Sequence, residues 1–294
     1  MKIVGIGEVL WDVFADSEKL GGASFNFAAQ ASRLGHDVTF VSAVGDDERG
    51  RAILRRAEDL RLRSDFLQTV KGVATGTVSV SVDSAGQPDY VIHRPAAYDA
   101  VHLDEADLAK LAAMQPDWMY FGTLHQAEAT SRAETRKLAR ALPGAKKFYD
   151  INLRRNCYTR ELLAELMPMA QVVKLNDEEA REIDEMFGWR HESLAELTGT
   201  WLSRFGWEAM AVTRGALGSA IRIGGDYAEP ASFPVKVVDT VGAGDAFSAA
   251  LLHGISQGWD AERSGDFANR VGALVASRPG ALPEWSLECA LALG

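Results

Sequence analysis

Residues 238–247 read Val-Asp-Thr-Val-Gly-Ala-Gly-Asp-Ala-Phe, which places two glycines and a carboxylate directly before an apolar run. Glycine adopts backbone angles that other residues avoid, and it lets a ligand approach the main chain closely. The run over 246–255 predicts a helix, whose first N–H groups have no partner within the helix and attract an anion. The segment therefore predicts a phosphate-binding turn, with the backbone of Gly242, Ala243 and Gly244 supplying the amides.

Asp245 stands at the start of the same predicted helix. Phosphoryl transfer spreads negative charge over the moving group, so fixed donors at this point stabilise the transition state. The attacking hydroxyl loses its proton late, which means that a well-placed carboxylate is an adequate base. We interpret the segment as the catalytic centre of a kinase for a small hydroxylated molecule, with Asp245 as the base. A helix N-cap without catalytic function is the alternative.

Further polar residues and glycines follow the predicted strands. Apolar strands are expected over 2–6, 38–44, 118–121, 147–151, 171–175 and 209–213, and helices over 25–34 and 50–60. Ligands of open α/β sheets bind beyond the carboxyl ends of the strands. The residues expected to gather at that edge are Asp12, Asn152, Arg154, Asn176 and Gly215.

The alternation of helices with apolar strands predicts a parallel sheet covered on both faces. Residues 77–82 instead alternate between valine and hydroxyl side chains, and a turn at 85–88 leads into a returning strand at 90–93. This half-exposed hairpin is expected to lie outside the main layer as a lid, with an ordinary edge hairpin as the alternative.

The bulk properties limit the class of protein. The 294 residues carry a net charge of −10, which argues against nucleic acid and anionic membranes as partners. No apolar run is long enough to cross a bilayer, and the N-terminus is a poor signal peptide. The two cysteines, Cys157 and Cys289, have no metal-ligand spacing and fit a reducing compartment, so we expect a cytoplasmic protein.

The 238–247 segment resembles the C-terminal signature of the ribokinase-like sugar kinases, also called the phosphofructokinase B family. Residues 21–28 and 44–50 resemble its N-terminal signature, and four shorter matches follow in family order at 150–154, 176–179, 213–218 and 269–281. The resemblance covers essentially the whole chain. It implies a single domain over 1–294 and a three-layer α/β/α sandwich with a mainly parallel central sheet. Lid segments are expected near 11–20 and 72–98.

The resemblance also implies roles for individual residues. ATP is the expected donor, Mg²⁺ the expected companion, and a small sugar the acceptor. Asp245 is the implied base, and Gly242, Ala243 and Gly244 form the implied anion hole. The residues expected to bind the acceptor are Asp12, Gly22 and Asn26, with Arg154 on the acceptor or the transferred phosphate.

The remaining implied roles concern the nucleotide and the ions. Asn176 and Glu179 are expected in the Mg²⁺–phosphate region, with Glu179 acting through water. Thr213, Gly215 and Gly218 are expected to line the nucleotide site, with Asn269 near adenine. Asp239, together with the loop at 278–281, is a candidate K⁺ site. A homodimer through the lid is an arrangement that related kinases suggest.

Segments 7–14 and 21–26 are most similar to bacterial fructokinase-like members, although many of those have proline where this chain has Ser24. Arg94, in the stretch that leaves the lid, is a cation where a fructose enzyme is expected to have a neutral or acidic residue. If Arg94 faces the site, an acidic sugar such as 2-keto-3-deoxygluconate becomes an alternative; fructose is favoured. Two other classes are alternatives: a catalytically silent sugar-binding relative, and a Rossmann oxidoreductase, which Gly5 and Gly7 suggest but whose third glycine is missing.

Overall fold

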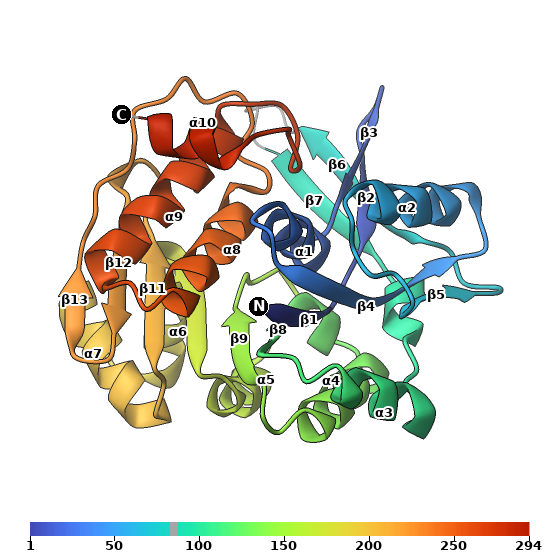
Figure 1. Cartoon of the computed structure of the whole chain (residues 1–294), viewed down its shortest axis with the longest axis horizontal. Coiled ribbons are helices and arrows are strands. Elements are labelled where there is room, and N and C mark those ends of the chain that lie inside the picture. The colour runs from blue at the N-terminus through green and yellow to red at the C-terminus, as the bar shows by residue number, and fades with distance from the viewer. Residues whose placement is uncertain (83–87, 294) are drawn as a thin grey trace.

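The computed structural model describes residues 1–82 and 88–293. Its central sheet has nine strands in the order β13-β12-β11-β10-β9-β8-β1-β4-β5 (Figure 1). The strands are β1 (Lys2–Ile6), β4 (Asp37–Gly45), β5 (Leu67–Val70), β8 (Trp118–Gly122), β9 (Lys146–Asp150), β10 (Val172–Asn176), β11 (Ala209–Thr213), β12 (Ser219–Ile223) and β13 (Asp226–Ala228).

All neighbouring strands from β5 to β11 run parallel, and only β12 and β13 are antiparallel. The parallel register aligns the strand ends: Asp150 of β9 pairs with Lys174 of β10, and Asn176 of β10 with Thr213 of β11. The predicted gathering of polar residues at one edge follows from this register. The predicted α/β class with a mainly parallel sheet is confirmed.

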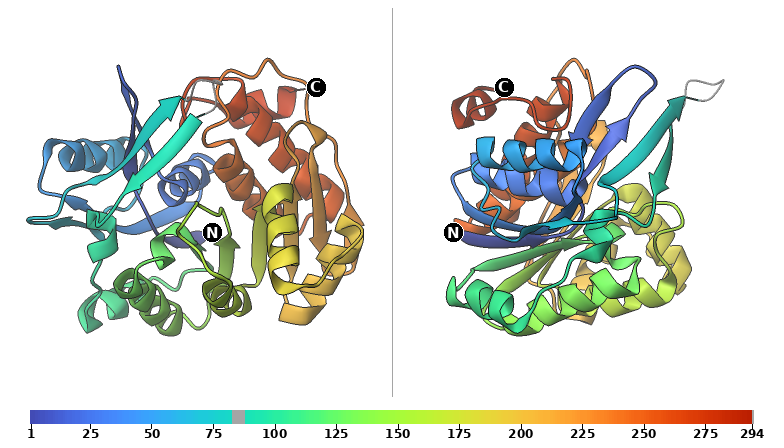
Figure 2. Two further views of the ribbon diagram at one scale, coloured as in Figure 1. Left: turned by 180° about the vertical axis from the view of Figure 1, so that it is seen from behind. Right: turned by 90° about the vertical axis from the view of Figure 1, so that its right-hand side faces the viewer.

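Helices cover both faces of the sheet, which makes three layers (Figure 2). One face carries α1 (Ala23–Arg33), α2 (Glu48–Asp59), α8 (Ala243–Ser256), α9 (Ala261–Ala276) and α10 (Leu287–Ala292). The other face carries α3 (Glu105–Ala113), α4 (Ala129–Ala141), α5 (Arg160–Leu166), α6 (Asp177–Phe187) and α7 (Leu194–Phe205). Successive strand residues point to opposite faces, so Ile3 of β1 enters one hydrophobic core and Val4 enters the other.

A second sheet, in the order β3-β2-β6-β7, stands apart from the main one (Figures 1 and 2). It consists of β2 (Leu10–Val13), β3 (Glu18–Gly21), β6 (Gly76–Val82) and β7 (Pro88–His93), which come from the two segments predicted to form a lid. The predicted alternation is confirmed at Val78 and Val80, which are buried in a small third core. Residues 85–87 of the predicted turn lie outside the described part of the chain.

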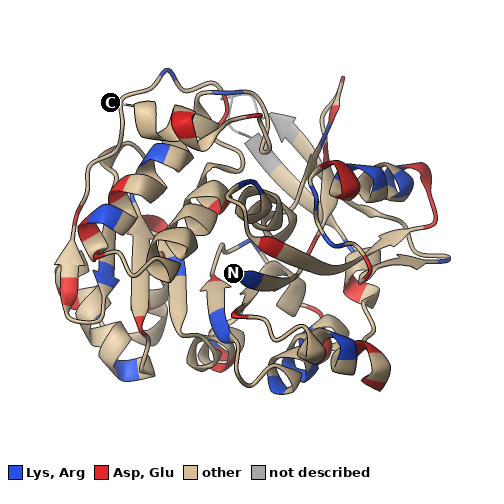
Figure 3. Cartoon of the chain, in the orientation of Figure 1, with Lys and Arg blue, Asp and Glu red and all other residues tan. Residues whose placement is uncertain are grey.

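Most predicted elements occur within a few residues of their expected bounds, whereas the antiparallel pair β12–β13 was not predicted. Helix α8 begins at Ala243, three residues before its predicted start, because Gly242 takes the left-handed N-cap position. Charges of both signs are distributed over many elements (Figure 3). Within residues 1–82 and 88–293, no helix combines the length and hydropathy that a bilayer crossing requires.

Candidate active site

A cavity of about 960 Å³ lies between the second sheet and the carboxyl ends of β9, β10 and β11. Its walls come from segments that are far apart in the sequence. Eleven of the predicted residues line it: Asp12, Gly22, Asn26, Arg94, Asn152, Arg154, Asn176, Thr213, Gly242, Gly244 and Asp245. The structure therefore brings the predicted acceptor residues, the glycine turn and the candidate base into one space.

The glycine turn at the head of α8 presents unpaired amides. Among the described residues, the main-chain N–H groups of Gly242, Gly244 and Asp245 have no acceptor. The Ala243 N–H differs from its predicted role, because it donates to the carbonyl of Thr240 (3.2 Å). The turn therefore offers donors from residues 242, 244 and 245 rather than from 242–244, and the helix dipole adds to their attraction for an anion.

Gly242 is required at the turn for two reasons. Its φ is +80°, in the left-handed region, and a Cβ there would stand 2.6 Å from the Cα and the carbonyl oxygen of Ala281. Gly244 faces the other side, where a Cβ would lie 3.2 Å from the Lys174 ammonium. Both glycines thus allow neighbouring groups to approach the main chain of the anion turn.

Asp245 is 8% exposed and faces the cavity. Burial, with the nearby Asp150 carboxylate, raises the pKa of Asp245 to about 7, while the Asn26 hydrogen bond, Lys174 and Arg154 oppose the rise. Nδ2 of Asn26 donates to Oδ2 of Asp245 (2.8 Å), and Oδ1 of Asn26 is buried without a partner in the described structure. The Asp245 carboxylate, which can accept a proton, therefore lies beside the Asn26 amide oxygen, which has no hydrogen-bond donor in the described structure. A substrate hydroxyl could donate to either oxygen.

A second carboxylate lies on the side of the cavity formed by the second sheet. Burial raises the pKa of Asp12 to about 6, against the charges of Arg154 and Lys19. Arg154 is exposed and lines the cavity, and its charge partly opposes the rise that burial causes in the pKa values of Glu8 and Asp245. Gly22 is the N-cap of α1 at φ +102°, where a Cβ would meet the Glu8 carbonyl at 2.8 Å. This part of the cavity offers acceptors and one cation to a polyhydroxylated ligand.

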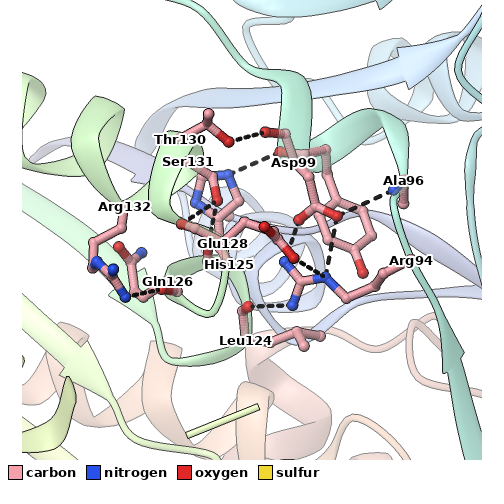
Figure 4. Close-up of polar contacts among 12 residues, drawn as sticks. Arg94, Ala96, Asp99, Leu124, His125, Gln126, Glu128, Thr130, Ser131 and Arg132 are labelled. Carbon is pink, nitrogen blue, oxygen red and sulfur yellow. Dashed lines mark hydrogen bonds and ion pairs between the residues drawn. The ribbon is translucent and has the colours of Figure 1, made fainter. Parts of the chain in front are cut away.

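Arg94 faces the cavity, but its charge is matched by protein groups (Figure 4). Its Nη2 forms an ion pair with Asp99 Oδ1, and Nε lies 3.1 Å from Asp99 Oδ2. Nη1 donates to the Leu124 carbonyl (3.1 Å), and Glu128 lies 3.9 Å from Nε. Only 14% of the Arg94 side chain is exposed. The guanidinium is therefore a neutralised part of the wall rather than an isolated cation.

The predicted nucleotide residues fall into two groups. Asn176 and Thr213 line the cavity, while Gly215, Gly218 and Asn269 do not. Gly218, at φ +88°, lets the backbone of 230–232 approach closely, since a Cβ would lie 2.2 Å from the Pro230 carbonyl. Asn269 is buried and donates to the carbonyls of Pro230 and Ala231. Gly218 and Asn269 thus position the loop that follows β13.

Glu179 and Asn176 form a capping box at the start of α6. The Glu179 carboxylate accepts from the N–H groups of Asn176 (2.8 Å) and Leu153 (2.7 Å), and Asn176 Oδ1 accepts from the Glu179 N–H. Glu179 is 7% exposed and is not among the residues that line the cavity, so its predicted role toward Mg²⁺ stays a prediction. The described residues contain no group of three or more His, Cys, Asp or Glu side chains that could hold a metal directly.

The candidate K⁺ ligand Asp239 already binds a cation of the protein. Nζ of Lys19, on β3, lies 2.9 Å from Asp239 Oδ2. The same carboxylate accepts from the N–H groups of Gly280 and Val241, both at 3.1 Å. Burial opposes ionisation, but the Lys19 hydrogen bond and these amides lower the pKa of Asp239. The contact also joins the second sheet to the segment that leads into the anion turn.

Two groups of buried polar residues at the site were not predicted. Glu8 lines the cavity and accepts from the N–H (3.3 Å) and the hydroxyl (3.0 Å) of Ser24. Behind the anion turn, Lys174 pairs with Asp150, and Asp150 Oδ2 also accepts from the Ser248 hydroxyl (2.6 Å). A lysine within the otherwise apolar strand β10 was the available sequence signal, because a charge in a strand buried on both faces needs a partner.

Comparisons with known proteins agree with this geometry. A model of the pfkB family carbohydrate kinases matches residues 4–286. A fructokinase of Klebsiella pneumoniae is 30% identical over 271 residues, which cover 87% of this chain and 84% of that protein. An aminoimidazole riboside kinase of Salmonella typhimurium is 27% identical, over 89% of this chain and 83% of that protein.

A sugar kinase of Pyrococcus horikoshii, solved in complex with ATP, superposes with a TM-score of 0.82 at 27% identity, over 95% of this chain and 94% of that one. The family match spans both predicted signatures and all the strands that carry the site. The chain therefore belongs to the pfkB family of carbohydrate kinases, enzymes that transfer a phosphoryl group to a sugar hydroxyl.

Proposed function

We propose that this kinase transfers the γ-phosphate of ATP to a hydroxyl of fructose. The observation that carries the proposal is the meeting of Asp245, the partnerless Asn26 Oδ1 and the unpaired amides of the anion turn in one cavity. The 30% identity to a fructokinase supports the acceptor, and the ATP complex of the Pyrococcus horikoshii kinase supports the donor.

In the proposed reaction, Asn26 Oδ1 and Asp12 accept hydrogen bonds from hydroxyl groups of the sugar and orient it. Asp245 takes the proton of the attacking hydroxyl, and the amides of 242, 244 and 245 hold the transferred group. Asn176 and Glu179 would hold a hydrated Mg²⁺ through water, and the ion would supply positive charge to the phosphates. Thr213 lies on the nucleotide side, and Gly215, Gly218 and Asn269 hold the surrounding loops in place.

We further propose that the second sheet acts as a lid over the bound sugar, since β2, β6 and β7 form one wall of the cavity. Closure would keep water away from the transferable phosphate. A catalytically silent relative is disfavoured because the candidate base and the anion turn are both intact. A dimer through the second sheet stays a prediction, which sedimentation at several protein concentrations tests.

The neutralised Arg94 gives no support to 2-keto-3-deoxygluconate as the acceptor. A sugar acid bound beside Arg94 would need an unpaired guanidinium there, whereas the Asp99 carboxylate already pairs with it. We therefore expect Asp99→Asn to release the Arg94 charge and to raise kcat/KM for a sugar acid relative to fructose by about tenfold, the effect of roughly 1.4 kcal/mol. Arg94→Gln in the same background should abolish the gain. An unchanged preference in Asp99→Asn contradicts this role.

An ADP-release assay over ketohexoses, aldoses, sugar acids and nucleosides, with aminoimidazole riboside included, tests the acceptor. We expect the highest kcat/KM for fructose. A preference of tenfold or more for another class overturns fructose but leaves the kinase assignment intact. No ADP release with any acceptor, despite ATP binding, overturns the activity.

The Lys19–Asp239 pair predicts how the enzyme responds to monovalent cations. The Lys19 ammonium is already paired with the carboxylate that a K⁺ ion would need. We therefore expect the wild-type kcat to be equal, within about twofold, in K⁺ and in tetramethylammonium buffers. Lys19→Met frees the carboxylate and should make kcat depend on K⁺. A wild-type enzyme that requires K⁺ contradicts the prediction.

A further inference from the structure

A buried ion pair lies directly behind the anion turn. Nζ of Lys174 is 3.2 Å from Oδ1 of Asp150, and the two side chains are 7% and 0% exposed. The residues are register partners on the neighbouring strands β10 and β9. Burying such a pair is expensive unless hydrogen bonds complete it, so its position calls for an explanation beyond stability.

Further hydrogen bonds satisfy the Asp150 side of the pair, whereas the Lys174 side is open to the cavity. Asp150 Oδ2 accepts from the Ser248 hydroxyl (2.6 Å), and the Tyr120 hydroxyl lies 3.5 Å away. Among the described residues, Asp150 is the one hydrogen-bond partner of the Lys174 ammonium, which also lines the cavity beside Gly244. The ammonium is thus fixed by Asp150 while its remaining donors face the site.

We propose that Lys174 is a positioning residue whose fixed positive charge increases the ionised fraction of the Asp245 carboxyl at neutral pH, and with it the fraction able to accept the sugar proton. The inference rests on the kinase function proposed above. Lys174 acts through Asp245 and the anion turn, and Asp150 holds its ammonium at the right place. The absent side chain of Gly244 lets the ammonium reach this position.

The charged and titratable groups around Asp245 come from several elements. Asp150 on β9 opposes its ionisation, while Lys174 on β10 and Arg154 after β9 favour it. Tyr120 on β8 interacts electrostatically with Asp245, and Asn26 on α1 donates a hydrogen bond to its carboxylate. Burial lowers the pKa of Lys174, but the surrounding carboxylates, Asp150 first, raise it overall, so the lysine stays charged. The two members of the pair therefore act on Asp245 in opposite directions.

The test is to measure kcat/KM for the best acceptor as a function of pH. The midpoint of the fall in kcat/KM on the acid side, here called the acid limb, reports the pKa of the essential base in the free enzyme. The wild-type limb should lie near pH 7. Lys174→Met should move its midpoint up by about 1 pH unit or more, and Asp150→Asn should move it down. Combining the two changes should return the limb close to the wild-type position, and Lys174→Arg should keep it there.

Lys147→Met is the matched control, because Lys147 lies on β9 at the end opposite Asp150, does not line the cavity and should leave the limb unchanged. Limbs that coincide in all variants, or shifts of the same sign in Lys174→Met and Asp150→Asn, overturn the inference. If Lys174→Met does not fold, as circular dichroism would reveal, Asp150→Asn and the double variant decide. A wild type without phosphoryl transfer refutes the proposed function instead.

Discussion

Asp245→Asn is expected to lower kcat by about 10²–10⁴-fold, the usual contribution of a general base, while ATP and sugar still bind. The change is nearly isosteric, so the contact with Asn26 can persist as an amide–amide hydrogen bond. Single-turnover kinetics and calorimetric titration of ATP separate the loss of chemistry from a loss of binding. An unchanged kcat removes Asp245 from the role of base.

The same substitution should change the stability in a pH-dependent manner. The pKa of Asp245 is about 7 in the folded protein and near 4 when unfolded, so the folded state gains stability from protonation at low pH. As the pH rises from about 4 to about 7, the free energy of unfolding loses this contribution, which is roughly 4 kcal/mol for a pKa shift of this size. Asp245→Asn should therefore melt above the wild type at pH 8, with a smaller difference at pH 5.

Asp260→Asn serves as the control for this series. Asp260 is the N-cap of α9, where asparagine caps equally well, so both kcat and the melting temperature should stay close to those of the wild type. If the two variants changed the melting temperature alike at pH 8, the stabilisation would not come from the buried carboxyl.

Gly242→Ala is expected to reduce kcat by about 10²–10³-fold, comparable to the loss of a preorganised donor. The left-handed backbone costs an alanine about 1 kcal/mol, and the new Cβ would also stand 2.6 Å from the Ala281 backbone. The turn must shift, which moves the amides away from the phosphoryl group. Steady-state kinetics and thermal melts should show a loss in both activity and stability.

Gly258→Ala provides the matched comparison. Gly258 follows the other end of α8 with a φ of +70°, and no atom lies within 4 Å of a Cβ built there. It therefore imposes the backbone penalty without the clash and far from the cavity. If Gly258→Ala lowered kcat as much as Gly242→Ala, the steric account of the anion turn would be wrong.

The sequence was informative where function depends on consecutive residues. The turn, the helix dipole and Asp245 occur within one segment, so their chemistry could be predicted without knowing the fold. The main sheet could also be predicted, because apolar strands alternate with helices. The antiparallel strands β12 and β13 extend the sheet beyond β11 to its edge, and their short sequences carry little periodicity.

Contacts that depend on the folded backbone, whether between near or distant residues, could not be predicted. Whether Arg94 meets the ligand as a free cation depends on Asp99 and Leu124, which only the folded chain brings together. Lys174 lay inside a correctly predicted strand, but its partner Asp150 belongs to another strand. The Ala243 amide was predicted to be free. It instead donates to the Thr240 carbonyl, which the left-handed turn brings within reach.

The hydrogen bond between Asn26 and Asp245 joins residues 219 positions apart in the chain. During synthesis, the acceptor side of the cavity emerges from the ribosome long before α8 does. The base can meet its partner only after α8 has packed against α1, so a nascent or truncated chain that lacks α8 carries no half-active centre. Turnover is therefore a direct report of completed folding, and recovery of kinase activity during refolding should follow the docking of this helix.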